Sequence, residues 1–478
     1  MSATVCACAA GEVTGAGSAL DAAADVVPNG DVAFDAAPTD IGSSTDVSAK
    51  DAPFDAPSEA LPDAPSDGDR ADAAPPPPLR VARRDVPLTP VGSVRQPSVC
   101  FHAGADAFAA AYTWVLPASP TPRFRVEVRA VTLTSDGTPS ASAPLLVDGD
   151  SLAHDSGDPR IAAPDRADLP ALVAWVDDRS APGARGAIEL YGRFVRVTGG
   201  AAPGVAAAGD VFPISQHPGT DEHLPGVAWD GAAGAFLVAW ADDRERAMRH
   251  EDARVIYARL VTPDGRVGPE LRVGDEGLFQ TAPSAASCGD GRFLVTWTDY
   301  RAEGRTLVTR ARGRILDART GEARSAIALW GEAPSVPQDP VAVQCAPGGD
   351  GWVVAWSVGG PPSIRQVRVA RLTRDGALDG EPSAPSAQPD GARAPDLAVA
   401  ATGQTVLTTL AQDSTYGHAR VLGGDVRALT AATTLTPSPP RLGTFWASVA
   451  ASSRRAEALV VMTLDYDRLH ATTLVAAP

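Results

Sequence analysis

Three short segments of the chain place an aspartate two residues after a tryptophan and an arginine two residues after that aspartate. Carboxylate and guanidinium groups in this pattern could bind a polar ligand, and paired carboxylates could hold calcium. A motif repeated along a chain more often serves each repeat, and here the carboxylate would cap a turn while the arginine pairs with it. No EF-hand spacing is present, so we expect no cofactor, with calcium as the alternative. The segments are Trp175/Asp177/Arg179, Trp240/Asp242/Arg244 and Trp297/Asp299/Arg301.

Two histidines form a second candidate group for chemistry. His217 and His223 flank a short polar segment, and with Asp221 or Glu222 they could bind a metal ion. The spacing matches no defined metal site, and histidines in exposed loops are common, so the group is a candidate only.

The cysteines suggest a covalent link. Cys288 and Cys345 each lie five residues after a proline, at matching places in neighbouring repeats. In an oxidising compartment they could form a disulfide if their Cα atoms come within about 7 Å. Two small buried thiols are the alternative, which the usual burial of free cysteine favours. Cys100 lies at a different position, and we expect it in the core.

No catalytic constellation stands out in the sequence. We find no Ser/His/Asp set with supporting context, no phosphate-binding glycine loop and no zinc-type Cys/His spacing, so no catalytic residue is predicted. Carboxylates from distant segments could still meet in the fold.

The charge of the chain is concentrated at its N-terminus. Residues 1–80 hold fourteen acidic and three basic residues, so they carry −11 of the formal net charge of −17. No basic segment offsets this charge, which argues against a nucleic-acid partner. Residues 1–78 repeat Asp-Ala-Pro and end in four prolines, a composition typical of a disordered, extended tether. No segment approaches the apolar length of a membrane helix, and no complete signal peptide is present.

The remaining 400 residues repeat one pattern of four short strands. The clearest copy has strands at 225–229, 236–240, 255–261 and 270–273, with an Asp-Gly turn before the last. The second strand ends at intervals of 53 to 65 residues. Four alternating strands per repeat predict an all-β fold, a β-propeller of seven blades, with six blades as the alternative. The second-strand ends are Trp114, Trp175, Trp240, Trp297, Trp356, Leu410 and Thr463.

The two ends of the repeat region predict how the ring closes. The seventh copy lacks a fourth strand, whereas Leu79–Leu88 precede the first copy as a strand without a repeat of its own. If this strand completes the seventh blade, no sheet edge is left unpaired. We therefore expect a tether at 1–78 and a propeller at 79–478. Its blades would cover about 94–155, 156–220, 221–278, 279–335, 336–390, 391–440 and 441–478 with 79–91.

The repeats resemble those of secreted and lipoprotein bacterial β-propellers that contain LVAWxDxR and IYARxxxxDG segments. The resemblance covers residues 79–478 and implies a fold but no activity. Sialidases share the layout, but their Asp-box is absent, because only its Asp-Gly turn recurs, at 135–138, 263–266 and 374–377. The segment Val5-Cys6-Ala7-Cys8 resembles the end of a lipoprotein signal without the upstream apolar stretch, which makes Cys8 a lipidation candidate.

These observations lead to a functional expectation. Strands alternate in direction, so loops after the second strand of each blade share one face with the connections between blades, and the three Asp/Arg pairs fall on that face. We expect a monomeric, extracytoplasmic and non-catalytic propeller that binds a glycan or a protein there, with membrane contact only through a lipid anchor. The alternatives are a polysaccharide hydrolase or lyase at the ring's mouth, which inward carboxylates with a raised pKa would favour, and a structural envelope component.

Overall fold

The structure is a computed structural model that describes residues 77–478. Within this range it does not describe residues 117–122, 150–153, 181, 183–187, 216, 218–219, 246–252, 276–278, 304–305, 327, 335–339, 360–364, 386–391, 412–415, 436–443, 465–467 and 477–478. The predicted tether lies outside the described residues apart from its last two, and so does Cys8. Where the chain is described, we find no helix with the length and apolar character needed to cross a membrane.

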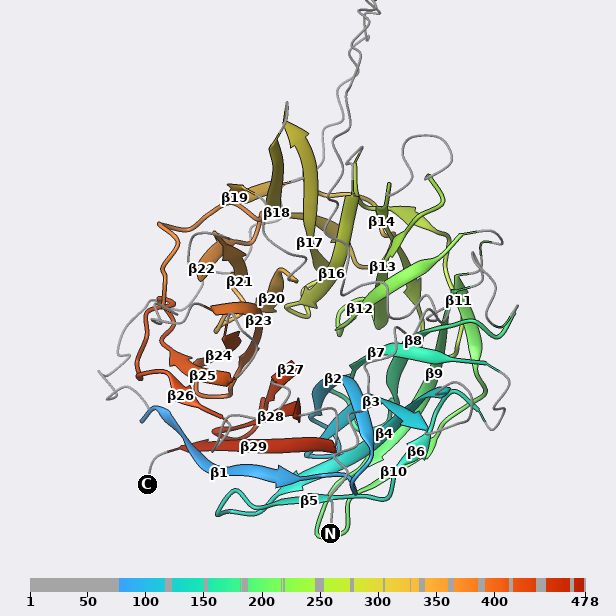
Figure 1. Ribbon diagram of the computed structural model, residues 1–478, viewed down its shortest axis with the longest axis vertical. Helices are drawn as coiled ribbons and strands as arrows, with labels where there is room; N and C mark the ends of the chain where they lie inside the picture. Colours follow the sequence, from blue (N-terminus) through green and yellow to red (C-terminus); the bar gives the residue numbers. More distant parts are fainter. Residues whose placement is uncertain are drawn as a thin grey trace, which may run out of the picture. The chain divides into compact units, whose positions relative to one another are not determined.

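Seven antiparallel sheets surround a common centre and form a seven-bladed propeller (Figure 1). The predicted fold is therefore confirmed, and the six-bladed alternative is excluded. The first strand of each blade lies nearest the centre. Blade 1 contains β2 (Ser93–His102), β3 (Ala107–Leu116), β4 (Arg123–Leu133), β5 (Pro139–Ala141) and β6 (Leu145–Leu146); blade 2 contains β7 (Ser156–Ala162), β8 (Ala171–Asp177), β9 (Glu189–Thr198), β10 (Gly204–Ala207) and β11 (Phe212–Ser215).

The other blades repeat this order with one exception. Blade 5 has three strands, and the bridge between Val369 and Ser383 stands in for the expected fourth. Blade 3 contains β12 (Glu222–Asp230), β13 (Ala235–Asp242), β14 (Val255–Val261) and β15 (Leu271–Arg272); blade 4 contains β16 (Phe279–Ser287), β17 (Arg292–Glu303), β18 (Thr306–Asp317) and β19 (Ala328–Pro334); blade 5 contains β20 (Ala342–Cys345), β21 (Gly351–Val358) and β22 (Gln366–Thr373); blade 6 contains β23 (Ala392–Val399), β24 (Thr405–Ala411), β25 (Gly417–Leu422) and β26 (Thr433–Thr434); blade 7 contains β27 (Thr444–Ala451), β28 (Glu457–Leu464) and β29 (Arg468–Ala476), with β1 (Leu79–Pro87) at its edge.

The ring closes through the N-terminal strand, as the sequence predicted. β1 pairs antiparallel with β29 from Leu79 opposite Ala476 to Pro87 opposite His470, and the register shifts between Val81 and Val86. Figure 1 shows the two strands side by side, in blue and red. Leu88 extends the pairing by donating its N–H to the carbonyl of Leu469 at 2.8 Å. The last sheet is thereby completed by the first segment of the described chain.

The core lies between neighbouring blades. All eight residues of β13 are buried, because both faces of this sheet pack against other blades. Trp175, Trp240 and Trp297 in the second strands of blades 2, 3 and 4 are fully buried. In blade 1 the strand register gives the corresponding place to Tyr112 and not to the predicted Trp114. Tyr112 carries a polar group into this position, and its hydroxyl donates to Glu127 at 2.7 Å.

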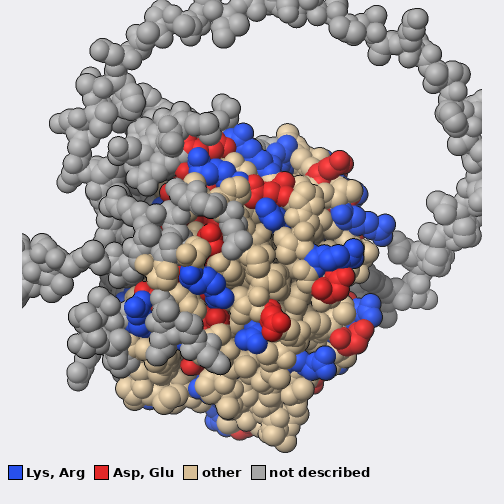
Figure 2. All heavy atoms as spheres, turned by 90° about the vertical axis from the view of Figure 1, so that its right-hand side faces the viewer, with Lys and Arg blue, Asp and Glu red and all other residues tan. Residues whose placement is uncertain are grey.

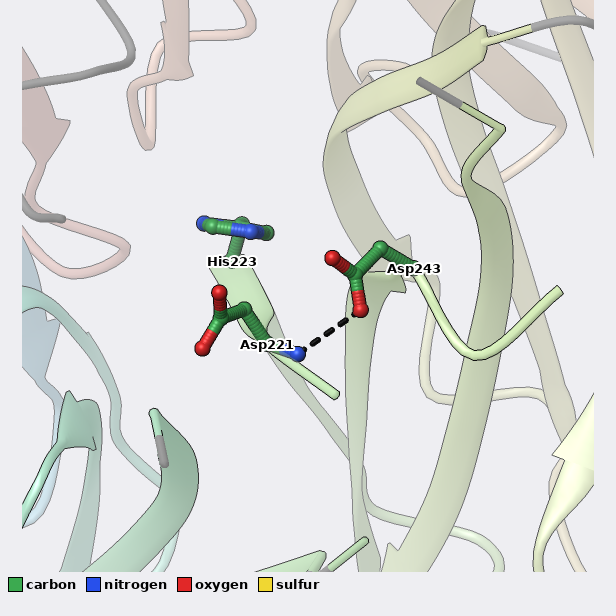
Figure 3. A group of neighbouring side chains, drawn as sticks. All are labelled: Asp221, His223 and Asp243. Carbon is green, nitrogen blue, oxygen red and sulfur yellow. Dashed lines mark hydrogen bonds between the residues drawn. The ribbon is translucent and has the colours of Figure 1, made fainter. Parts of the chain in front are cut away.

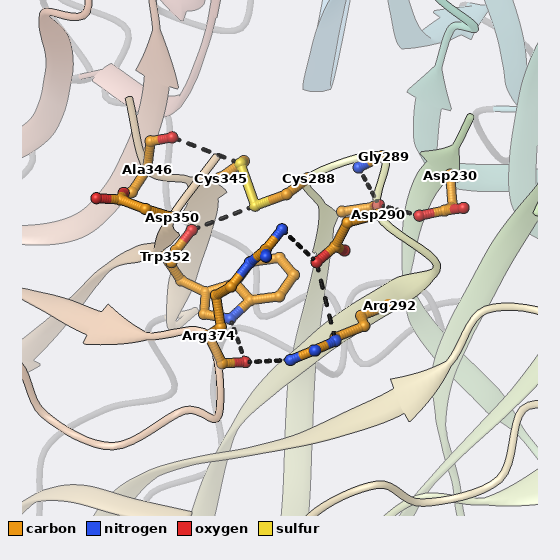
Figure 4. Close-up of a disulfide and its surroundings, with 12 residues drawn as sticks. Asp230, Cys288, Gly289, Asp290, Arg292, Cys345, Ala346, Asp350, Trp352 and Arg374 are labelled. Carbon is orange, nitrogen blue, oxygen red and sulfur yellow. Dashed lines mark hydrogen bonds and ion pairs between the residues drawn. A yellow bond between two sulfur atoms is a disulfide. The ribbon is translucent and has the colours of Figure 1, made fainter. Parts of the chain in front are cut away.

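A disulfide joins blades 4 and 5 (Figure 4). Cys288 follows β16 and Cys345 ends β20, and their Cα atoms are 5.0 Å apart. The disulfide candidate is thus formed, and the favoured alternative of two separate thiols was wrong, since the spacing of the prolines did not reveal how closely the two strand ends approach. Cys100 packs against the core as expected, and burial raises the pKa of its thiol to about 12.

Candidate functional site

The upper face, as we define it, carries the loops between second and third strands and the connections between blades. The predicted Asp/Arg pairs lie there, but the carboxylates of Asp177, Asp242 and Asp299 are fully buried. Asp242 accepts hydrogen bonds from the indole N–H of Trp240 at 3.2 Å and the backbone N–H of Arg244 at 2.8 Å. The guanidinium of Arg244 also pairs with this carboxylate.

The same arrangement recurs in the neighbouring blades. Asp177 accepts from the indole of Trp175 at 3.1 Å and from the backbone N–H of Arg179 at 2.8 Å. The guanidinium carbon of Arg179 lies 4.3 Å from the ring centroid of Tyr191, a cation–π contact on the next strand. These are the contacts expected of a structural motif that fixes the loop of its own blade.

Blade 4 varies the motif. The Nε–H of Arg301 donates to Asp299 at 2.7 Å, and both Arg301 and Arg312 pair with Asp275 at 2.8 and 2.9 Å. In this blade too, the guanidinium groups pair with carboxylates, although Asp299 Oδ1 and the indole N–H of Trp297 have no hydrogen-bond partner.

A second repeated element links adjacent blades. In blade 2, the backbone N–H of Asp155 donates to the Asp178 carboxylate at 2.7 Å, and the N–H of Asp178 donates to the Asp155 carbonyl at 3.2 Å. In blade 3, Asp221 and Asp243 repeat both bonds at 2.8 and 3.3 Å. The first aspartate of each pair also accepts a backbone N–H from the preceding blade, at 3.0 and 3.2 Å. We call these two pairs the aspartate latches.

Blade 3 adds a histidine to its latch (Figure 3). His223 lies two residues after Asp221, at the place that Gly157 occupies in blade 2. One ligand atom from each of Asp221, His223 and Asp243 lies within 4.8 Å of the other two. The Nε2 atom of His223 is buried and has no hydrogen-bond partner. Figure 3 shows the carboxylates of Asp221 and Asp243 on the same side of the His223 imidazole ring.

The electrostatics of this group keep the imidazole neutral. Burial and the charge of Arg254 hold the pKa of His223 well below its usual range. Burial raises the pKa of Asp243, and the carboxylate of Asp221 adds to that shift. A neutral imidazole offers a lone pair, so the group could serve as a metal ligand set or accept a proton.

The structure separates the other predicted members of this group. His217 lies apart from the cluster, and its Nε2 is 3.2 Å from Glu270. Glu222 is fully buried and accepts a hydrogen bond from Ser215 at 2.7 Å. Asp243 therefore replaces His217 as the third member. Asp243 was not predicted as a member of this group, because it lies in the loop after β13, between Asp242 and Arg244 of the repeated Asp/Arg motif.

The inner strands share a strained bulge that the sequence did not reveal. A residue with a φ of 46° to 50° stands directly before the proline that opens the blade, although a residue with a Cβ rarely adopts this conformation. Its recurrence around the ring indicates a structural role, and it sets the direction of the neighbouring side chains. The residues are Gln96, Asp158, Leu224, Ala282 and Ala394.

Three charged residues lie on the innermost strands of blades 2 and 6, namely Asp158, Arg160 and Asp396. Asp158 is 5% exposed, and its Oδ1 atom has no hydrogen-bond partner. Burial raises the pKa of Asp158 to about 6, and the charge of Arg160 opposes the shift. Burial lowers the pKa of Arg160, and the charges of Asp158 and Asp396 both oppose this shift. Arg160 thus lies within electrostatic reach of carboxylates from blades 2 and 6.

Asp396 is held in place from blade 7. Its carboxylate accepts hydrogen bonds from the Ser448 hydroxyl at 3.0 Å and the Val449 N–H at 2.9 Å, and burial raises its pKa. Asp396 and Arg160 are both partly exposed. Sequence reasoning missed this group, although one signal was present, because Arg160 and Asp396 directly follow a blade-opening proline, where blades 1, 3 and 4 have Ser or Gly.

Figure 2 shows the distribution of charge on one face of the described chain. On the face shown in Figure 2, acidic and basic side chains are interspersed. This mixture agrees with the sequence, where the acidic excess lies in the first 80 residues. The charged residues at the ring centre are therefore distinguished by their burial and convergence and not by a broad field.

The fold and these groups define a seven-bladed β-propeller with charged residues on its inner strands. No protein-family model and no curated protein matches the chain. Similar solved structures include an α-L-arabinanase of Penicillium chrysogenum with arabinobiose (TM-score 0.44, 11% identity, 82% of this chain and 97% of that one). A Trypanosoma rangeli sialidase with the inhibitor DANA (0.45, 11%, 83% and 58%) and a protein of unknown function from Dyadobacter fermentans (0.47, 13%, 84% and 100%) are also similar. No activity follows from similarity at this level.

Proposed function

We propose that this chain is an extracytoplasmic, non-catalytic propeller that binds a glycan at the upper face, at the centre of its ring. The observation that carries the proposal is the meeting of Asp158, Arg160 and Asp396 there. The carboxylates of the repeated Asp/Arg pairs are fully buried and already hold the arginines of the pairs, whereas Arg160 and Asp396 are both partly exposed. The polar groups that are accessible to a ligand therefore lie at the centre of the ring.

The chemistry of this group suits a polar sugar. A guanidinium donates several hydrogen bonds in a fixed plane, and carboxylates accept from hydroxyl groups. A protein partner usually needs a wide patch with aromatic anchors. The exposed large hydrophobic residues in the described part of the chain are Val91, Leu378 and Leu429, none of them aromatic. These features favour a glycan over a protein.

The disulfide supports the proposed location. Disulfides persist in oxidising compartments, and Cys288–Cys345 joins two blades of the ring. A tether of acidic and proline-rich sequence and a lipid on Cys8 would hold the propeller away from a membrane surface. We propose that the protein acts there as a monomer.

Binding of the full chain to a glycan array, with and without calcium, tests the proposal. The variants Asp396→Asn and Arg160→Gln should lose a reproducible signal, whereas Asp168→Asn, an exposed residue outside the ring centre, should keep it. Circular dichroism and thermal melting establish that each variant is folded. A blank array, or a signal unchanged in both central variants, would overturn the proposal and favour a protein partner or a structural envelope role.

A second candidate function has an observation of its own. Two carboxyl groups on the inner strands could support glycoside hydrolysis, in which one carboxylic acid with a raised pKa protonates the leaving group and a second, ionised carboxylate assists. Asp158 would be the acid and Asp396 the second carboxylate. Mass spectrometry of a bound glycan after incubation decides between the two functions. Cleavage products that disappear in Asp158→Asn would establish catalysis, and an intact glycan would leave binding alone.

A further inference from the structure

We propose that Asp221, His223 and Asp243 bind a divalent transition-metal ion on the upper face of blade 3. This site is separate from the ring centre and does not depend on the proposed glycan binding. Its ligand atoms lie within 4.8 Å of one another. The three residues come from the segment before β12, from β12 itself and from the loop after β13, which the blade-3 latch holds together at 2.8 Å.

The comparison between blades shows what the histidine adds. Blade 2 forms the same latch with Asp155 and Asp178 and has Gly157 where blade 3 has His223. The latch therefore does not require a histidine. The Nε2 atom of His223 is buried without a hydrogen-bond partner, which is unfavourable for a polar atom. A metal ion between this nitrogen and the two carboxylates would give the nitrogen the partner that it lacks.

The donor atoms indicate which class of metal fits. Calcium and magnesium prefer oxygen ligands alone, whereas zinc and related ions accept an imidazole nitrogen together with carboxylate oxygens. Ligand atoms around tetrahedral zinc are about 3.3 Å apart, given metal–ligand bonds of about 2.0 Å. Binding would therefore require side-chain rotations that bring the ligand atoms closer than their separation of up to 4.8 Å. Three protein ligands would leave one position open to water or to a ligand.

The surrounding charge sets a moderate affinity. Two carboxylates face one guanidinium, that of Arg254, whose charge acts on both Asp243 and His223. Arg254 is held over the ring of Phe279, with its guanidinium carbon 4.7 Å from the centroid. One net negative charge remains for the cation, so we expect weaker binding than in a closed structural zinc site.

Isothermal titration of the full chain with Zn²⁺ tests the proposal. His223→Ala should bind one ion fewer than the natural chain, or bind it at least about 100-fold more weakly, since losing only a hydrogen-bond partner of a metal ligand already costs about 10- to 100-fold. His217→Ala is the matched control, because this histidine pairs with Glu270 outside the cluster, and it should bind as the natural chain does. Thermal melting without metal establishes that both variants fold.

A second measurement separates this site from the N-terminal thiols. Co²⁺ bound by thiolates such as Cys6 and Cys8 gives an intense charge-transfer band, whereas a site of one nitrogen and two oxygens gives only weak visible bands. The weak bands should disappear in His223→Ala and persist in His217→Ala. No Zn²⁺ binding by the natural chain, or equal stoichiometry and affinity in the His223→Ala variant, would overturn the proposal.

Discussion

Truncating Leu79 tests whether closure of the ring holds the propeller together. Leu79 begins β1, is 2% exposed and packs with residues of blades 6 and 7, among them Val406 and Leu474. Its backbone N–H donates to the Gln404 side chain at 3.0 Å. The substitution Leu79→Ala leaves these backbone bonds in place and removes only the side chain that the closing strand inserts into the core.

The expected loss of stability follows from the burial of this side chain. Leucine to alanine removes three carbon groups, worth about 2.4 kcal/mol at about 0.8 kcal/mol each. The cavity that remains between the blades adds to this cost, so we expect a loss of about 3–4 kcal/mol in the free energy of unfolding. That is a large share of the roughly 5–15 kcal/mol typical of a folded protein.

Urea unfolding of the full chain, followed by tryptophan fluorescence, measures the effect. Val91→Ala is the matched control, because Val91 follows the same strand but is 69% exposed, and it should change the free energy by less than about 0.5 kcal/mol. Deleting residues 79–91 should destabilise the domain further by opening the ring. If Leu79→Ala costs no more than Val91→Ala, closure by β1 does not stabilise the ring and our reasoning fails.

Three further predictions concern stability. Asp177→Ala leaves Arg179 without its buried partner and should cost about 3–5 kcal/mol in urea unfolding, whereas Asp168→Ala, in an exposed pair, should change little; equal effects would contradict the structural role of the Asp/Arg pairs. Replacing Cys288 and Cys345 by serine opens a loop with a sequence separation of 57 and should cost about 4 kcal/mol, and reductant should lower the stability of the natural chain but not of the variant. Burial raises the pKa of Glu222 to about 8, so the folded state holds this proton more tightly than the unfolded chain, and its contribution should be most favourable below about pH 4.5 and decline up to about pH 8. Glu222→Gln should remove that decline. If the free energy of unfolding of the variant depends on pH as that of the natural chain does, the assignment is refuted.

Much of the architecture was predictable because its signals are local. Alternating apolar residues define each strand, and the Asp-Gly turns before the fourth strands place glycine at a φ of 78° to 86°, where a side chain would be strained. The repeat of 53 to 65 residues then gives the number of blades. The missing strand at one end and the extra strand at the other indicated closure, because an unpaired edge is unfavourable.

Local signals misled where registers shift. The sequence predicted Trp114 for the position that Tyr112 occupies in blade 1. A bulge in the inner strand changes the pairing of the two strands by an amount that the sequence does not reveal. Blade 5 has no fourth strand but a single bridge, although its sequence follows the same repeat. The sequence predicted a metal group with both His217 and His223, but only His223 belongs to the cluster.

The sequence by itself determined the strands, the blades and the closure of the ring, because period-2 burial and turn residues act over a few neighbouring positions. Only the tertiary structure decided which residues meet. Arg160 and Asp396 come together because the inner strands converge on one axis, Cys288 and Cys345 because two strand ends approach, and Asp243 joins His223 because a latch fixes its loop. These encounters depend on the curvature of the whole ring, which no short segment encodes.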